Sequence, residues 1–131
     1  MESPLRGKRR KNLDIQQIIN RIRQRPDFDK AGMVLAHNGV VRGTSRDGRK
    51  VSGLKVSVDH EKLEQILEKE RQTPGIIDII IEIAEDRHLA VGDDVMALVV
   101  AGDIRDTVIP VLERTLNAVK TTVTSKTEFF I

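Results

Sequence analysis

The chain has 131 residues, of which 39% are hydrophobic and 32% are charged, a composition typical of one soluble globular domain. It contains no cysteine, which excludes disulfides, thiolate catalysis and cysteine-based metal sites. No apolar run reaches the length of a membrane-spanning helix, so a membrane is not an expected partner. With no cysteine and no secretory leader, the sequence favours a cytoplasmic protein.

The net charge of +2 is unevenly distributed along the chain. Five of the 22 basic residues and one of the 20 acidic residues lie in the first eleven positions, so the rest is slightly acidic. We expect residues 1–12 to form a basic, disordered tail and residues 13–131 to form a single domain. Such a tail can bind nucleic acid, but with no Trp or Tyr for base stacking, nucleic acid is not an expected partner of the domain.

The first half of the chain predicts one helix and two strands. Asp14 and Gln17 resemble a capping box, and isoleucines at helical spacing follow, which predicts a helix over residues 14–24. Apolar and β-branched residues predict strands at 31–42 and 51–58. We expect these two strands to pair as a hairpin with a long loop.

The second half alternates between helix and strand patterns. Apolar residues at helical spacing predict helices at 59–72 and 106–120. Alternating or continuous apolar runs predict strands at 76–83 and 95–101, and a β-branched run at 121–124 suggests a closing strand. The element order after the leading helix, β–β–α–β–β–α–β, predicts an α+β fold rather than a doubly wound sheet.

Arginines supply the clearest chemical signals. Arg42 directly follows an apolar strand and opens a loop with glycines, and its planar guanidinium suits phosphate or carboxylate. For Arg42 both an anion site and a solvated loop charge stay open, whereas Arg46 and Arg49 are interpreted as solvated loop charges. Arg105 lies near a predicted helix start, where backbone N–H groups favour anions.

Lysines and histidines give weaker signals. Lys120 ends a predicted helix, where a cation stabilises the helix dipole but where a lysine can also act as a base or nucleophile. His37, His60 and His88 have no metal-ligand spacing, and the sequence contains no P-loop, dinucleotide fingerprint or nucleophile elbow. The sequence therefore predicts neither a metal site nor a cofactor.

Four segments in order along the chain resemble one protein family. They are Gly39-Val40-Val41-Arg42, Asp47-Gly48-Arg49-Lys50-Val51, Leu89-Ala90-Val91-Gly92-Asp93-Asp94 and Val119-Lys120-Thr121. Together, over residues 31–127, they resemble the catalytic (large) subunit of molybdopterin synthase. The resemblance implies an α/β hammerhead-type fold with mixed or antiparallel sheets and packed helices, and a homodimer.

The resemblance also implies a function in molybdenum cofactor biosynthesis. A ubiquitin-like sulfur-carrier small subunit binds each end of the homodimer, which gives a heterotetramer. Its thiocarboxylated Gly-Gly tail enters the large subunit, and sulfur is transferred to cyclic pyranopterin monophosphate to build the dithiolene of molybdopterin. The chain would then be a sulfurtransferase with an anion-binding pocket.

The same resemblance assigns roles to four residues of this sequence. Arg42 matches an arginine that lines the substrate phosphate region, and Arg105 matches the arginine of a His-Arg pair, so both are expected to bind substrate. Lys120 and Lys126 match two catalytic lysines. Their expected roles are to activate the thiocarboxylate or the substrate and to stabilise charge.

The chain departs from the family near these residues. Ile104 replaces the histidine of the His-Arg pair, His37 stands where an aromatic residue is common, and an alignment without a gap puts Thr127 rather than Lys126 at the second lysine. The approach to that lysine, Pro-aromatic-aromatic in the family, is Val123-Thr124-Ser125 here, and the family usually continues past the position of Ile131 with a tail that helps to cover the site. A second hypothesis therefore stays open, a non-catalytic dimeric homologue that binds a carrier protein or a phosphorylated ligand.

Overall fold

Two three-stranded antiparallel sheets form the scaffold of the computed structural model, which describes residues 13–131. The basic tail expected for residues 1–12 lies outside the described residues. The first sheet has the order β1-β5-β3, and the second has the order β4-β2-β6. The strands are β1 (Met33–Val40), β2 (Val51–Val58), β3 (Ile76–Ile83), β4 (Leu89–Ala90), β5 (Asp94–Gly102) and β6 (Thr124–Phe130).

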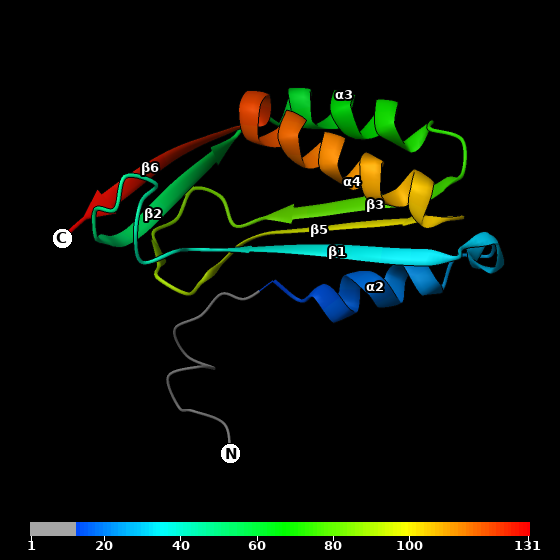
Figure 1. Cartoon of the computed structure of the whole chain (residues 1–131), viewed down its shortest axis with the longest axis horizontal. Coiled ribbons are helices and arrows are strands. Elements are labelled where there is room, and N and C mark those ends of the chain that lie inside the picture. Colours follow the sequence, from blue (N-terminus) through cyan, green and yellow to red (C-terminus); the bar gives the residue numbers. More distant parts are fainter. Residues whose placement is uncertain (1–12) are drawn as a thin grey trace, which may run out of the picture.

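Three α-helices cover the two faces of the first sheet (Figure 1). They are α2 (Ile15–Arg23) on one face, and α3 (His60–Arg71) and α4 (Arg105–Ala118) on the other. A short 3₁₀ turn, η1 (Phe28–Lys30), precedes β1. The side chains of Asp14 and Asp59 cap α2 and α3, because each accepts a hydrogen bond from the backbone N–H three residues later. Among residues 13–131, no helix combines the length and hydropathy that crossing a membrane requires.

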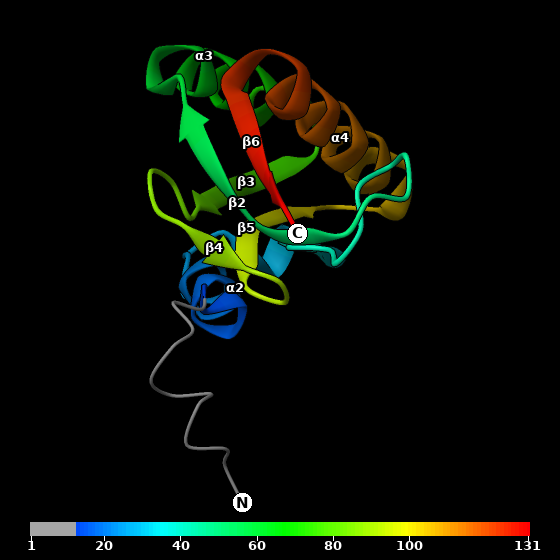
Figure 2. The same ribbon diagram turned by 90° about the vertical axis from the view of Figure 1, so that its left-hand side faces the viewer.

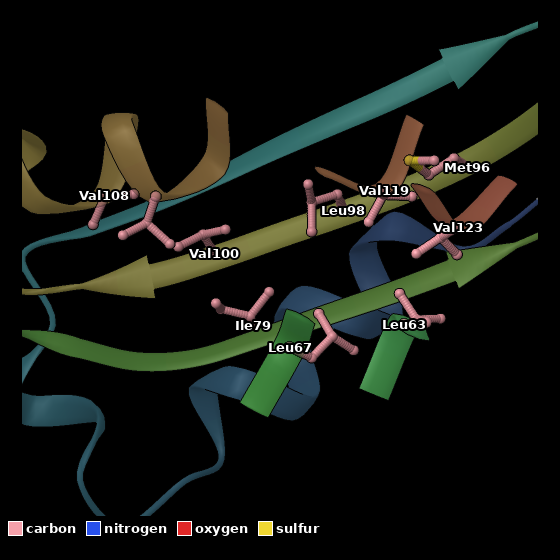
Figure 3. Packing of buried hydrophobic residues seen from close by; sticks show 10 residues of the cluster. Leu63, Leu67, Ile79, Met96, Leu98, Val100, Val108, Val119 and Val123 are labelled. Atoms are coloured by element: carbon pink, nitrogen blue, oxygen red, sulfur yellow. The ribbon is translucent and has the colours of Figure 1, made fainter. Parts of the chain in front are cut away.

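The central strand β5 is buried on both faces. Its alternate residues Met96, Leu98 and Val100 pack under α3 and α4, as the close view of this cluster shows (Figure 3). The intervening residues Ala97, Val99 and Ala101 face α2. Burying each large apolar side chain stabilises the fold by about 1.5–3 kcal/mol. Because β5 buries side chains on both of its faces, it packs against both helical layers.

The strand pairing corrects one expectation. The predicted hairpin between residues 31–42 and 51–58 is wrong, because β1 pairs with β5 while β2 pairs with β6 and β4. The connecting loop contributes a single β-bridge, between Thr44 and Lys50. The apolar pattern marks a strand without naming its partner, and β5, apolar throughout, takes the central position.

The chain after α4 also differs from the prediction. The sequence predicts a helix up to residue 120 and a strand at 121–124, but Val119–Val123 form a π-helical turn, η2, and β6 begins at Thr124. The hydroxyls of Thr121 and Thr122 donate hydrogen bonds to carbonyls of the preceding helical turn, at 2.9 and 2.7 Å. These local bonds compete with strand formation, so a β-branched run continues the helix for one wide turn.

Candidate functional site

A cavity of about 380 Å³ lies at the junction of the two sheets. In Figure 2, which looks onto this end of the molecule, β2 and β6 stand in front of β3 and β5. Twelve residues from β1, β2, β3, β5, β6, η2 and the loop after β1 line the cavity. They are His37, Gly39, Val40, Arg46, Leu54, Val56, Ile83, Val95, Met96, Lys120, Thr124 and Lys126.

The lining has an apolar part and a cationic part. Six of its residues are aliphatic or Met, and the three permanent charges all belong to cations, namely Arg46, Lys120 and Lys126. No carboxylate is among the twelve lining residues, all of which lie in the described part of the chain. Cavities of about 300–1,000 Å³ with a few polar groups on an apolar wall are typical small-molecule sites, and this one suits an anion.

The register of β6 turns Lys126 toward the cavity. Lys126 lies opposite Val56, and Thr127 lies opposite Lys55. Directly opposite residues of an antiparallel pair project from the same face, and Val56 is buried at the cavity while Lys55 is exposed. The structure therefore turns Lys126, and not Thr127, toward the cavity.

Lys120 reaches the same cavity from η2. Val119, which precedes Lys120, and Val123 are both buried in the core above the first sheet. This anchoring fixes the π-helical turn and leaves Lys120 on its exposed side, at the edge of the cavity. Two lysines from different elements thus line one site.

Arg46 is exposed, as a solvated loop charge should be, but it also lines the cavity, which the sequence did not indicate. A tight turn returns the loop at this point. The buried Ser45 accepts a hydrogen bond from the N–H of Arg49 at 3.1 Å and donates one to Asp47, and this contact is the main cause of the lowered pKa of the Asp47 carboxyl. The position of Arg46 at the cavity depends on this turn. The number of arginines in the loop does not indicate which of them the turn brings to the cavity.

Arg42 and Arg49 lie outside the lining. Arg42 is exposed and donates from Nε to the carbonyl of Thr44 at 3.0 Å, although it stands in the chain between two lining residues. Arg49 lies over the ring of Phe130, with 3.6 Å from its guanidinium carbon to the ring centroid. Arg49 is therefore engaged at the C-terminal strand by a cation–π contact.

Arg105 occupies a separate, shallow hollow at the start of α4. Its side chain is 82% exposed and lies 4.0 Å from the carboxylate of Asp106. Fifteen residues of helix separate it from Lys120, which corresponds to about 22 Å at 1.5 Å per residue. On one chain, Arg105 and Lys120 therefore do not contact the same small ligand.

His37 lines the cavity from β1. The side chain is half-buried, and its pKa is lowered, first by burial and then by the positive charge of Lys120. The imidazole is therefore neutral at neutral pH. The sequence showed that His37 lacks metal-ligand spacing and stands where an aromatic residue is common in the family, but it did not place His37 at an anion site. Among residues 13–131, no group of three or more His, Cys, Asp or Glu is placed to hold a metal ion.

Comparison with known proteins gives a consistent picture. Residues 8–122 match the model of a family described as MoaE protein. No curated protein sequence matches the chain. Among solved structures, the molybdopterin synthase from Staphylococcus aureus is similar with a TM-score of 0.76 at 20% identity, over 93% of this chain and 88% of that chain.

Two further structures are similar. The molybdopterin biosynthesis MoaE protein from Burkholderia ambifaria MC40-6 has a TM-score of 0.72 at 18% identity, over 92% of this chain and 85% of that chain. The complex of subunits 1 and 2 of molybdopterin-converting factor from Helicobacter pylori 26695 contains a similar chain, with a TM-score of 0.67 at 15% identity. The similarity covers 91% of this chain and 84% of that chain. These likenesses confirm the predicted α+β fold of the hammerhead type.

Proposed function

Because the chain belongs to the MoaE protein family, we propose that it is the catalytic subunit of a molybdopterin synthase. Family membership connects it with molybdenum cofactor biosynthesis. The proposed reaction transfers two sulfur atoms, one from each of two thiocarboxylated tails of a ubiquitin-like small subunit, to cyclic pyranopterin monophosphate. Water supplies the oxygen that leaves each tail as a carboxylate, and the two sulfurs make the dithiolene of molybdopterin. The Helicobacter pylori complex of subunits 1 and 2 supports a small-subunit partner for this chain.

The observation that carries this proposal is the meeting of Lys120, Lys126 and Arg46 at a cavity with no carboxylate among its described lining residues. Both reactants are anionic, since one carries a phosphate and the other a thiocarboxylate. Cations that line a partly apolar cavity attract such charges more strongly than cations in bulk water do. The aliphatic part of the lining is suited to contact the ring system of the pterin.

The two lysines have the donors that the chemistry needs. Each ammonium group offers three N–H donors on a flexible stem, which suits a thiocarboxylate and the negative charge that develops when its carbon–sulfur bond breaks. We assign Lys120 and Lys126 to these tasks. Arg42 is assigned to the substrate phosphate at the edge of the cavity, because it stands between Val40 and Arg46, which both line the cavity.

Arg105 fits this function through a second copy of the chain. It lies too far along α4 to act with Lys120 of the same chain, and its exposed neighbours Ile104 and Ile109 are 55% and 48% accessible. Exposed aliphatic residues around a cation are suited to a protein interface. We therefore propose a homodimer in which Arg105 of one protomer reaches the cavity of the other, with one small subunit at each end of the resulting heterotetramer.

Mixed protomers test this arrangement. Arg105→Ala and Lys120→Ala homodimers are each expected to be inactive, whereas a mixed dimer contains one site with both side chains intact. Unfolding and reassembling the two variants together is expected to restore part of the synthase activity. Activity that stays absent in verified mixed dimers would contradict a shared site.

The proposed function is tested directly with the two reactants. We expect the wild-type protein, given a thiocarboxylated small subunit and cyclic pyranopterin monophosphate, to form the dithiolene product, and Lys120→Ala to lower the rate by about 100-fold or more. Absence of product with a small subunit that supports another synthase would reject the catalytic proposal. We place the reaction in the cytoplasm, since a chain without cysteine needs no oxidising compartment.

A second candidate function follows from the residues around Arg105. Ile104 stands at the position of the family's histidine, so one expected polar group is missing. A non-catalytic dimeric homologue would still bind a carrier protein or a phosphorylated ligand at the cationic cavity. Retained binding of the small subunit without dithiolene formation would favour this function over the enzyme.

A further inference from the structure

His37 is the lining residue of the cavity whose side chain can change its charge near neutral pH. The other charged lining residues of the described chain are two lysines and an arginine. The imidazole lies along β1, and a Cβ added to Gly39 would be 3.4 Å from its Nε2. The ring is therefore held close to the strand at the cavity wall.

The surroundings of His37 favour its neutral form while no anion is bound. Burial of the ring and the positive charge of Lys120 from η2 both disfavour a proton on the imidazole, and the other cations of the lining are Arg46 from the loop and Lys126 from β6. The lining residues from β2, β3 and β5 are aliphatic or Met, so no carboxylate of these strands offsets that repulsion. The backbone of His37 pairs with Leu98 in the first sheet, but within residues 13–131 its imidazole forms no hydrogen bond.

We propose that His37 is a further substrate-binding residue, which takes up a proton from solvent as two negative charges enter the cavity and binds them as an imidazolium. The inference rests on the proposed function for the anion site and adds the class of ligand. The ligand is either one dianion or a pair of monoanions such as a phosphate and a thiocarboxylate. No covalent bond other than the new N–H bond is made in this step.

The physical reason is the balance of charge in a confined space. Without a ligand, the imidazolium would be a fourth positive charge beside three cations. A dianion reverses the sign of the local potential at the ring and can accept a hydrogen bond from it. Proton binding and anion binding then strengthen each other by the same factor, as linkage requires.

The chain is well suited to a direct test because it has three histidines. The imidazole Cε1–Hε1 signals are followed by NMR against pH in sodium chloride and in sodium sulfate at equal ionic strength, and are assigned with His37→Phe and His60→Gln. Sulfate is the probe because it stays dianionic over the whole titration. We expect sulfate to raise the pKa of His37 by about one unit, a tenfold gain in proton affinity, and to leave His60 and His88 unchanged.

Two lysine variants provide matched controls. Lys120→Gln is expected to abolish the sulfate response of His37. Lys55→Gln is expected to keep it, because Lys55 lies on the outer face of β2 opposite Thr127. An equal rise for all three histidines, or a response that survives Lys120→Gln, would overturn the inference.

The same spectra separate this inference from the proposed function. If sulfate moves the backbone amide signals of Lys120 and Lys126 but not the pKa of His37, the anion site stands and the role of His37 is rejected. If neither responds up to about 100 mM sulfate, roughly 100 times the Kd of about 1 mM of a weak site, both the role of His37 and the anion site fail.

Discussion

The position of Lys126 depends on a register of one residue. A shift of β6 by one position against β2 would turn Thr127 to the cavity and Lys126 to the outside. The actual register follows from burying Leu54 and Val56 of β2 at the junction of the sheets. The orientation of Lys126 toward the cavity is thus set by the packing of residues on another strand, β2.

Thr115 is a residue at which the fold is not optimised. Thr115 belongs to α4 and its side chain is fully buried. Its hydroxyl has no hydrogen-bond partner within residues 13–131. A buried hydroxyl without a partner costs about 1–3 kcal/mol, so we expect Thr115→Val to raise the free energy of unfolding by about 1 kcal/mol in urea denaturation.

The matched control for this substitution is Thr122→Val. The hydroxyl of Thr122 is exposed and donates to the carbonyl of Ala118 at 2.7 Å, so its removal gives no comparable gain. If Thr115→Val is no more stable than Thr122→Val, the hydroxyl of Thr115 carries no desolvation cost.

At the scale of elements, one ion pair joins α3 to α4. The carboxylate of Glu70 accepts from Arg114 at 2.8 and 3.3 Å, and the side chain of Glu70 is only 9% exposed. Arg114→Ala would leave this carboxylate buried and unpaired. We expect a loss of about 1–3 kcal/mol in the free energy of unfolding.

Arg21 offers a comparison on the surface. It contacts Glu82 at the same distance of 2.8 Å, but the two side chains are 52% and 40% exposed. Arg21→Ala is expected to cost less than about 1 kcal/mol. Equal losses for the two arginine variants would show that burial of Glu70 does not determine the effect.

A second contact fastens the start of α3 to the segment after β3, and it depends on pH. His60 Nε2 lies 2.7 Å from Glu85, and this hydrogen bond is the main cause of the raised pKa of His60. A raised pKa in the folded state means that the contact stabilises the protein below pH 6.5, the ordinary value, and that this contribution is lost as the pH rises through the folded-state pKa.

Urea denaturation of the wild type and His60→Gln at several pH values measures this contribution. The stability difference between the two proteins is expected to fall as the pH rises above the ordinary histidine value. His37, whose lowered pKa has the opposite effect on stability, is present in both proteins and cancels in the difference. A difference that stays constant with pH would rule out the contact as a contributor.

At the scale of the whole molecule, local sequence patterns predicted most elements but not their partners. Caps at Asp14 and Asp59 and the period of apolar residues gave the helices and strands, because these signals act over a few residues. The predicted hairpin failed because the partner of β2, namely β6, lies about seventy residues away in the chain. The π-helical turn was missed because it depends on threonine hydroxyls that bond to helix carbonyls.

The sequence indicated only part of the candidate site, because sequence signals act over a few residues and do not show which distant residues meet. Resemblance pointed to Lys120 and Lys126, and both line the cavity, while Arg105 lies at the other end of α4. Arg46 and His37 were passed over, because their positions at the cavity depend on a turn and on contacts between sheets. Only the assembled fold brings these four lining residues to one place.

The proposed function requires that sulfur transfer takes place in the cavity between the sheets. It is tested most directly by two adjacent substitutions on opposite faces of β6, Lys126→Ala and Thr127→Ala, in a single-turnover reaction with a small subunit whose thiocarboxylate carries labelled sulfur. We predict that the label reaches the pterin with the wild type and with Thr127→Ala, and that Lys126→Ala slows the transfer by about 100-fold or more. Equal transfer by Lys126→Ala and the wild type would contradict the claim.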